Sequence, residues 1–521
     1  MKLTHLLGGF LLAWPLFAAP PSITTLTPAG GQRGTTVAVT AAGTFDQWPA
    51  KVWCDTPGVT VTAEKEKGKF TLKLAADAPL GPVWLRAHDD SGASELRPFV
   101  VGGLPERAEA EPNDDVKTAP AVALPNVLNG VLAKNGDVDC FAVALKKGQT
   151  LVASLDAHRT LRSPVDAVLQ VTSTDGTVVG QNHDARGLDP ELAFTAPADG
   201  TFAVRVFAFP SAPDSSIRHF GSPACVYRLT LTTDEFVDFV TPLAVEQAKE
   251  ASLTLSGWNL PTKTAKLDKA AVSFGVSNPF PVAREPHPCF VFTATDKPLS
   301  PPFTLTGRVE AAGAAVVVPV TLEAGKATAV RLESPSLGLS LTPVLTVLDS
   351  TGKQLVKAEP ATLGGTIDTT FTAPKAGVCK VEVRDLFKSS GPRHVFRLRV
   401  TPAAPDLTAT VTADRFSVAV GTPLDIPITL AKKYGFTGDL TASVEGLPDG
   451  MTASVTPPAK PDPNIVVLRL TATKPGVSGA IRIAVCKKGD DTFKRFATAA
   501  LPAFDRTTSD LWLTVPAASK K

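Results

Sequence analysis

The stretch AEAEPNDDVKTA, at residues 108–119, carries side chains that could hold a metal ion. Pro112 disfavours the helical region for the residue before it, so this segment should run extended. Residues two apart share a face of an extended chain, which places Glu109, Glu111 and Asn113 together, with Asp114 at the bend that follows. Carboxylate and amide oxygens are ligands of Ca²⁺, which takes about six to eight of them.

A second acidic pattern, GDVDCF at 136–141, places Asp137 and Asp139 on one face at the start of a predicted strand. These two carboxylates could complete the shell. The predicted site therefore holds one or two Ca²⁺ ions, with the ligands Glu109, Glu111, Asn113, Asp114, Asp137 and Asp139. Glu, Pro, Asn and Asp are also the ordinary composition of a solvated interdomain linker, and the residues alone leave that alternative open.

No familiar catalytic pattern accompanies these acids. The sequence has no HExxH, GxSxG, Walker loop, dinucleotide fingerprint or CxxCH. Histidines are scattered without metal-ligand spacing, and Ser163 beside Asp166 has no group to activate it. We therefore expect no catalytic residues and no enzymatic activity.

The elements that must position the acids are strands. Short segments rich in Val, Thr, Leu and Phe alternate with polar residues and stop at Gly, Pro, Asp or Asn, as in FAVALKKG and LRLTATKPG. The best helix candidate is short, at 245–253. The expected fold is all-β, with tandem antiparallel β-sandwiches, immunoglobulin-like and jelly-roll-like, joined by short linkers.

An internal repeat relates two of these sandwiches. Gly130 in NGVLAKNGDVDCFAVALKKGQ matches Gly307 in TGRVEAAGAAVVVPVTLEAGK, an offset of 177 residues (307 − 130). FTAPADG returns as FTAPKAG, and VYRLTLT returns as VFRLRVT. At the same offset Ala314 and Val316 replace Asp137 and Asp139, so the sandwich itself does not require the acids.

Residues 108–233 resemble the bacterial pre-peptidase C-terminal domain, related to the collagen-binding domains of clostridial collagenases. The resemblance rests on EPND, GDVDCF, KKGQ, SPVDAVLQV and APADGTFAVRV in that order. It implies a β-sandwich whose acidic segment and later Asp-x-Asp carry calcium. The flanking segments look like immunoglobulin-like modules, an order that is similar to secreted multi-domain proteins of planctomycete-type bacteria.

The predicted organisation has one targeting segment and five modules. They are a signal peptide at 1–18, an immunoglobulin-like sandwich at 20–103, the first repeat at 104–234, a small β module at 235–303, the second, degenerate repeat at 304–403, and a C-terminal immunoglobulin-like sandwich at 404–517. We call these the N-terminal module, first repeat, middle module, second repeat and C-terminal module.

The first 18 residues have a basic Lys2, an apolar run and small residues at the end, as an export signal does. The run is interrupted by Pro15 and is shorter than the roughly 20 apolar residues of a membrane span. We expect an exported protein, periplasmic or extracellular, with no membrane span after cleavage. The 52 basic and 50 acidic residues are balanced, which argues against nucleic acid as a partner.

These observations favour an exported, non-enzymatic binding or adhesion protein whose partner is an envelope or extracellular polymer or protein. The alternative is an accessory or catalytically degenerate relative of a secreted peptidase. Six cysteines, spread about one to a module with no CxxC pair, exclude a dense disulfide framework. Cys140 and Cys225 are expected on opposite faces of their strands, as buried thiols.

Overall fold

A computed structural model describes residues 19–212, 215, 218–294, 297–362 and 364–517, so the predicted signal peptide lies outside the described residues. Strands dominate. The helices of the described part are α1 (His158–Leu161) and three single turns of 3-10 helix, η1 (Val116–Thr118), η2 (Pro335–Leu337) and η3 (Pro502–Phe504). None of the described helices is long and apolar enough to cross a membrane. The all-β prediction, with many antiparallel sheets, is confirmed.

The N-terminal module packs two sheets around Leu72 and Phe99, which are almost fully buried. One sheet has the order β1 (Thr25–Thr27), β3 (Thr36–Ala42), β6 (Lys69–Leu74), β5 (Val59–Ala63). The other has the order β2 (Gly30–Gln32), β9 (Arg97–Gly102), β7 (Gly81–Asp89), β4 (Lys51–Trp53), and β8 (Gly92–Ala93) pairs with β7.

The first repeat is a sandwich of a five-stranded and a four-stranded sheet. The former has the order β10 (Glu106–Ala108), β11 (Asn126–Val131), β18 (Val226–Thr232), β13 (Thr150–Asp156), β16 (Glu191–Thr195). The latter has the order β12 (Asp139–Leu145), β17 (Gly200–Pro210), β14 (Val165–Thr172), β15 (Val178–Asn182). Cys225 packs in the core between the sheets, and both Cys140 and Cys225 are buried free thiols.

The second repeat has the same strand order in both of its sheets. One sheet has the order β26 (Cys289–Val291), β27 (Phe303–Arg308), β34 (Val395–Pro402), β29 (Ala327–Glu333), β32 (Ile367–Thr372). The other has the order β28 (Val316–Leu322), β33 (Gly377–Asp385), β30 (Pro343–Leu348), β31 (Gln354–Ala358). Because β26 pairs with β27, the second repeat includes residues from 289 onward, which the predicted boundary at 304 leaves in the middle module. The register agrees as well, because Gly130 faces Tyr227 across one ladder and Gly307 faces Phe396 across the other.

The middle module is built from three small sheets. They comprise β19 (Phe236–Thr241), β21 (Ala251–Trp258) and β22 (Thr264–Leu267); β20 (Ala244–Glu246) and β25 (Ala283–Glu285); and β23 (Ser273–Phe274) and β24 (Phe280–Pro281). The helix predicted at 245–253 is wrong, because β20 ends and β21 begins within that segment. Leu253 is buried in the core, and the pairing of β20 with β25 and of β21 with β22 satisfies the backbone of a segment that is too short for a stable helix.

The C-terminal module has one sheet of six strands and one of five. The first has the order β39 (Met451–Thr456), β40 (Ile465–Ala472), β37 (Leu424–Lys433), β35 (Asp406–Val411), β43 (Thr498–Leu501), β44 (Arg506–Thr508). The second has the order β36 (Arg415–Ser417), β45 (Leu511–Val515), β41 (Val477–Lys487), β38 (Leu440–Glu445), and β42 (Asp490–Phe496) pairs with β41.

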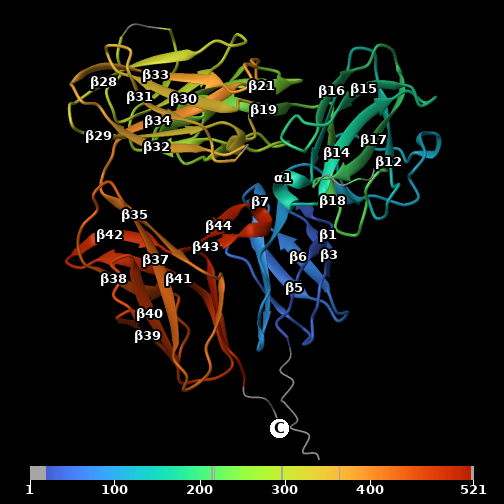
Figure 1. Cartoon of the computed structure of the whole chain (residues 1–521). Coiled ribbons are helices and arrows are strands. Elements are labelled where there is room, and N and C mark those ends of the chain that lie inside the picture. Colours follow the sequence, from blue (N-terminus) through green and yellow to red (C-terminus); the bar gives the residue numbers. More distant parts are fainter. Residues whose placement is uncertain (1–18, 213–214, 216–217, 295–296, 363, 518–521) are drawn as a thin grey trace, which may run out of the picture.

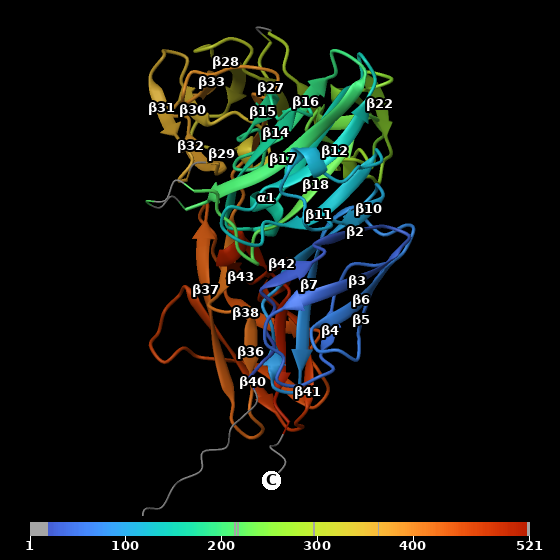
Figure 2. The same ribbon diagram turned by 90° about the vertical axis from the view of Figure 1, so that its right-hand side faces the viewer.

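The chain closes on itself, so that the first and last modules lie side by side (Figures 1 and 2). Arg86 of β7 forms an ion pair of 2.8 Å with Asp414, and its side chain is fully buried. Around this pair, Trp53 packs edge-on against Trp512 and Trp84 against Phe504, with ring centroids 6.2 and 5.0 Å apart.

A second group of buried charges joins the first repeat, the middle module and the second repeat. Arg186 lies 2.8 Å from Glu191 and 3.0 Å from Asp238, and Arg393 of the second repeat also pairs with Asp238. Arg186, Glu191 and Asp238 are all less than 8% exposed. Buried charges need partners at this distance, which fixes how the three modules dock.

Arg86→Met should destabilise the contact between the N-terminal and C-terminal modules by about 3 kcal/mol, because it leaves Asp414 with only the more exposed Arg415 as a partner. The double variant Arg86→Met/Asp414→Leu should recover most of that loss. Tryptophan fluorescence in a urea titration measures it, since Trp53, Trp84 and Trp512 lie in this contact.

The matched control is Lys69→Met, which breaks an exposed ion pair with Glu66 and should change stability by less than about 1 kcal/mol. Equal effects of Arg86→Met and Lys69→Met would show that the buried pair does not hold the modules together.

Candidate metal centre

The acidic segment is a crossover between the two sheets of the first repeat. At its start, Glu109 N donates to Asn129 O of β11 at 3.0 Å; further on, Cys140 N of β12 donates to Asn113 O at 2.9 Å. Ala121 then bridges to Ala142 of β12. The segment is therefore hydrogen-bonded to both sheets, which is not the arrangement of a solvated linker.

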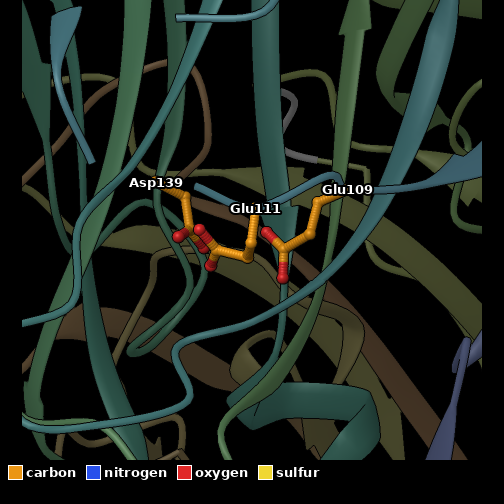
Figure 3. Close-up of side chains that lie close together, drawn as sticks. All are labelled: Glu109, Glu111 and Asp139. Carbon is orange, nitrogen blue, oxygen red and sulfur yellow. The ribbon is translucent and has the colours of Figure 1, made fainter. Parts of the chain in front are cut away.

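Three carboxylates converge where this crossover meets the start of β12. Glu109, Glu111 and Asp139 each offer an oxygen, and these oxygens lie within 4.8 Å of one another. Figure 3 shows the three side chains lying close together. Asp139 is fully buried and Glu109 partly so, whereas Glu111 is exposed. The cluster is thus closed on the protein side and open to solvent at Glu111.

The hydroxyl of Tyr227, on β18, lies between two of these acids. It is 2.8 Å from Glu109 Oε2 and 2.6 Å from Asp139 Oδ2. A phenol has one proton to donate, so it satisfies one of these oxygens at a time. The other carboxylate needs a proton or a cation.

The side chain of Asn113 completes the cluster and is fully buried. One end of its amide lies 3.1 Å from both Asp139 Oδ1 and Glu111 Oε2. With the nitrogen at that end, Asn113 donates hydrogen bonds to both acids. With the oxygen there, an amide oxygen joins the carboxylate oxygens, as it does in the shell of a hard cation.

Burial raises the pKa values of Asp139 and Glu109. It raises the pKa of Asp139 to about 9, and the negative charge of Glu109 adds to the effect against the hydrogen bond from Tyr227. Burial also raises the pKa of Glu109, opposed by the hydrogen bond that Val131 N donates to it. Without a cation, the cluster therefore keeps a proton near neutral pH.

Two of the six predicted ligands lie outside the cluster. Asp137 turns back into its own loop, where its carboxylate accepts a hydrogen bond from Ala133 N, and the side chain of Asp114 is exposed. The alternation that places Asp137 and Asp139 on one face holds only within a strand, and β12 begins at Asp139. The structure brings together Glu109, Glu111, Asn113 and Asp139.

In the second repeat the same place is apolar. Phe292 N donates to Thr306 O as Glu109 N does to Asn129 O, so Phe292 takes the place of Glu109. Val316 replaces Asp139, and Phe396 replaces Tyr227. Phe396 packs against Gly307 as Tyr227 packs against Gly130, where in each case a side chain on the glycine would collide with the ring. The second repeat therefore lacks both the carboxylates of Glu109 and Asp139 and the phenolic hydroxyl of Tyr227.

Tyr227 is the residue that reasoning from the sequence missed. The contrast between VYRLTLT and VFRLRVT, where a tyrosine in one strand matches a phenylalanine in the other, was the available signal. Its meaning depends on β18 lying beside β11, which no spacing in the sequence reveals.

Comparison with known proteins identifies part of the first repeat. Residues 137–208 match the bacterial pre-peptidase C-terminal domain family. The matched segment contains Asp139 and ends before Tyr227. A protein of Deinococcus radiodurans described as a probable subtilase-type serine protease is 31% identical over 98 residues, which cover 18% of this chain and 14% of that protein.

Among solved structures, the pre-peptidase C-terminal domain of a collagenase from Bacillus anthracis matches over its whole length and 24% of this chain, with 14% identity and a TM-score of 0.18. The insect immune protein hemolin matches over its whole length and 93% of this chain, with 11% identity and a TM-score of 0.22. Scores this low carry no argument about shape or function.

In the absence of divalent cations, the stability of the first repeat should fall as pH rises from about 4 to about 9. The pKa of Asp139 is higher in the folded than in the unfolded chain, so over this range the folded state binds more protons than the unfolded state, and the free energy of unfolding falls as pH rises. Asp139→Asn should make the slope shallower by up to about 1.4 kcal/mol per pH unit. Urea unfolding of the full chain in chelator, at a series of pH values, measures the slope.

Asp114→Asn is the matched control, because Asp114 lies in the same segment with its side chain in solvent. It should leave the slope unchanged. A slope that is the same in wild type and in Asp139→Asn would contradict the buried, protonated state of Asp139.

Proposed function

We propose that this chain is an exported, non-enzymatic binding or adhesion protein made of β-sandwiches, and that calcium stabilises its first repeat. Glu109, Glu111, Asn113 and Asp139 would hold the ion. The observation that carries the calcium proposal is a fully buried carboxylate, Asp139, pressed against a second carboxylate, Glu109, with a single hydroxyl between them.

The donor set fits a hard cation. Every group that converges offers oxygen, three carboxylates and one amide, and the cluster has no histidine or thiolate ligand of the kind that zinc prefers. Calcium accepts irregular geometry and a mixture of carboxylate, carbonyl and water oxygens. Exposed Glu111 leaves room for water at the open side.

A bound cation would replace the proton of Asp139 and tie three parts of the sandwich together. Glu109 and Glu111 belong to the crossover, Asp139 begins β12, and Tyr227 on β18 holds two of the carboxylates in place. Neutralising several carboxylates within a few ångströms removes their repulsion and fastens the crossover to both sheets.

Support for a binding role comes from the family match, since residues 137–208 match a domain rather than a peptidase. The matched segment of the Deinococcus radiodurans protein is a small part of a protein described as a protease, which favours the second candidate, an accessory or degenerate relative of a secreted peptidase. An exported protein is compatible with both candidate functions.

Isothermal titration calorimetry of the full chain should show calcium binding that Asp139→Asn abolishes and Asp114→Asn leaves unchanged. At about 100 times its dissociation constant, calcium should raise the free energy of opening the first repeat by roughly 2.7 kcal/mol. Hydrogen exchange at the amides of Val131 and Cys140, which hydrogen-bond to the crossover, reports that opening locally.

Loss of binding in Asp114→Asn but not in Asp139→Asn would contradict the assignment of the ligands. Equal exchange rates of the amides of Val131 and Cys140 in millimolar calcium and in chelator would show that the acids hold only protons.

The full chain should retain an envelope or extracellular polymer or protein from the cell's own envelope fraction, without releasing products from it. Retention should weaken in chelator if calcium holds the first repeat in shape, and Asp139→Asn should mimic the chelator. Peptide or sugar release that co-purifies with the chain and disappears in a single-residue variant would contradict the non-enzymatic proposal.

A further inference from the structure

A cavity of about 780 Å³ lies where the first repeat, the second repeat and the C-terminal module meet. The first repeat contributes α1 and the turn around Gly187, the second repeat contributes η2 and the turn around Gly364, and the C-terminal module contributes the start of β44. Figures 1 and 2 show α1 near the centre of the closed chain, next to the β43–β44 hairpin. Its size is in the range of ligand sites, about 300–1,000 Å³.

Four arginines line this cavity: Arg159, Arg162 and Arg186 from the first repeat and Arg506 from the C-terminal module. Arg186 is already paired with Glu191 and Asp238, which leaves the other three guanidiniums. Among the described residues, no ion pair joins any of them to a carboxylate, although Asp505 also lines the cavity. Burial lowers the pKa of Arg506, and the charges of Arg162 and Arg159 lower it further. The charge of Asp156 acts in the opposite direction on Arg506, but the three guanidiniums still repel one another, and a bound anion would relieve that repulsion.

Neighbouring groups fix the backbone of Arg159 and the side chain of Arg162. Asp189 lies beneath α1 and accepts hydrogen bonds from the backbone nitrogens of His158 and Arg159, at 2.7 and 2.9 Å. Arg162 adopts a left-handed backbone conformation, with φ 55°, and its Nη2 donates to Phe504 O at 2.7 Å. Residues other than glycine adopt that conformation at a cost, and such strain gathers at ligand sites.

Arg159 and Arg506 are both solvent-exposed, and the guanidinium of Arg159 lies against Gly338 of the second repeat. The side chains of Arg159 and Arg506 donate no hydrogen bond to any described residue, whereas Arg162 supports the turn at Phe504. A guanidinium has five N–H groups, so these side chains offer a fork of donors to an oxyanion.

The rest of the lining selects the kind of molecule that would carry the oxyanion. Hydroxyl groups come from all three modules, on Thr160, Ser336, Thr366 and Thr507. His158 supplies an aromatic ring, and the described lining has no phenylalanine, tyrosine or tryptophan. Hydroxyls beside arginines suit a sugar ring that bears an acidic group.

We propose that this junction pocket binds an acidic saccharide, with Arg159 and Arg506 holding its carboxylate or sulfate and the hydroxyls holding its ring. The proposal deepens the proposed binding function and rests on it, but not on the calcium site. Since the ligand would contact three modules at once, binding would also hold the closed arrangement of the chain.

The test is calorimetric titration of the full chain with oligogalacturonides, sulfated oligosaccharides and neutral oligosaccharides of matched length. One or both acidic ligands should bind, more weakly as salt rises, and the neutral one should not. Arg159→Gln and Arg506→Gln should each weaken binding about tenfold or more. Arg33→Gln, at an exposed arginine of the N-terminal module outside this pocket, should have no effect.

Folding is checked in the same samples. Arg506→Gln removes one of three mutually repelling charges, so its melting temperature without ligand should equal or exceed that of wild type. The acidic saccharide should raise the melting temperature of wild type and not that of the Arg159→Gln/Arg506→Gln variant.

Binding that both arginine variants retain, equal binding of the neutral oligosaccharide, or no binding of either acidic ligand at millimolar concentration would each overturn the proposal. Inorganic phosphate that binds as tightly as the saccharides would show an anion site without sugar recognition, which also overturns it. Envelope retention in the pull-down, combined with failure here, would reject this pocket and leave the general binding function standing.

Discussion

Charge taken out of water must be neutralised, and this constraint governs how the five modules of this protein fit together. Arg86 and Asp414 neutralise each other between the first and last modules, and Arg186, Glu191, Asp238 and Arg393 do so between the three central ones. A buried charge without its partner costs several kcal/mol, so each pair permits one docked arrangement and penalises others.

Two places in the structure depart from this balance, and both proposals come from them. The cluster around Asp139 has an excess of carboxylates, for which Tyr227 and Asn113 supply too few protons. The junction pocket has an excess of guanidiniums, for which the protein supplies no paired carboxylate among the described residues. A cluster of carboxylates favours binding of a cation, and a cluster of arginines favours binding of an anion. The two sites would therefore bind ligands of opposite charge.

The second repeat separates what the sandwich needs from what the site needs. Both repeats keep the glycine beneath an aromatic ring, because only glycine allows the ring to lie that close to the opposite strand. The second repeat fills the rest of the place with Phe292, Val316 and Phe396, which are stable there without any ion. The sandwich fold therefore does not require the polar cluster of the first repeat. The second repeat is the same fold with apolar residues at the matching positions.

The sequence by itself determined the strand content and the chemistry of the acidic segment. Period-two alternation and turn residues report local geometry. Glu109, Glu111 and Asn113 come together as predicted, although the chain bends at Glu111 and does not run extended throughout. Sequence reasoning failed at 245–253, where local helical character gave way to pairing with β25 and β22. It also failed at Asp137, which lies two residues before β12 begins.

Only the tertiary structure decided what lies across the sandwich and across the modules. Tyr227 is 118 residues from Glu109 in the chain, and it meets the acids because β18 pairs with β11. Arg162 and Arg506 face one cavity because the chain closes on itself, although they belong to different modules. Periodicity carries information over a few residues, whereas these contacts depend on which strands and modules pack together, and that is set by the sum of many burial and charge interactions along the whole chain.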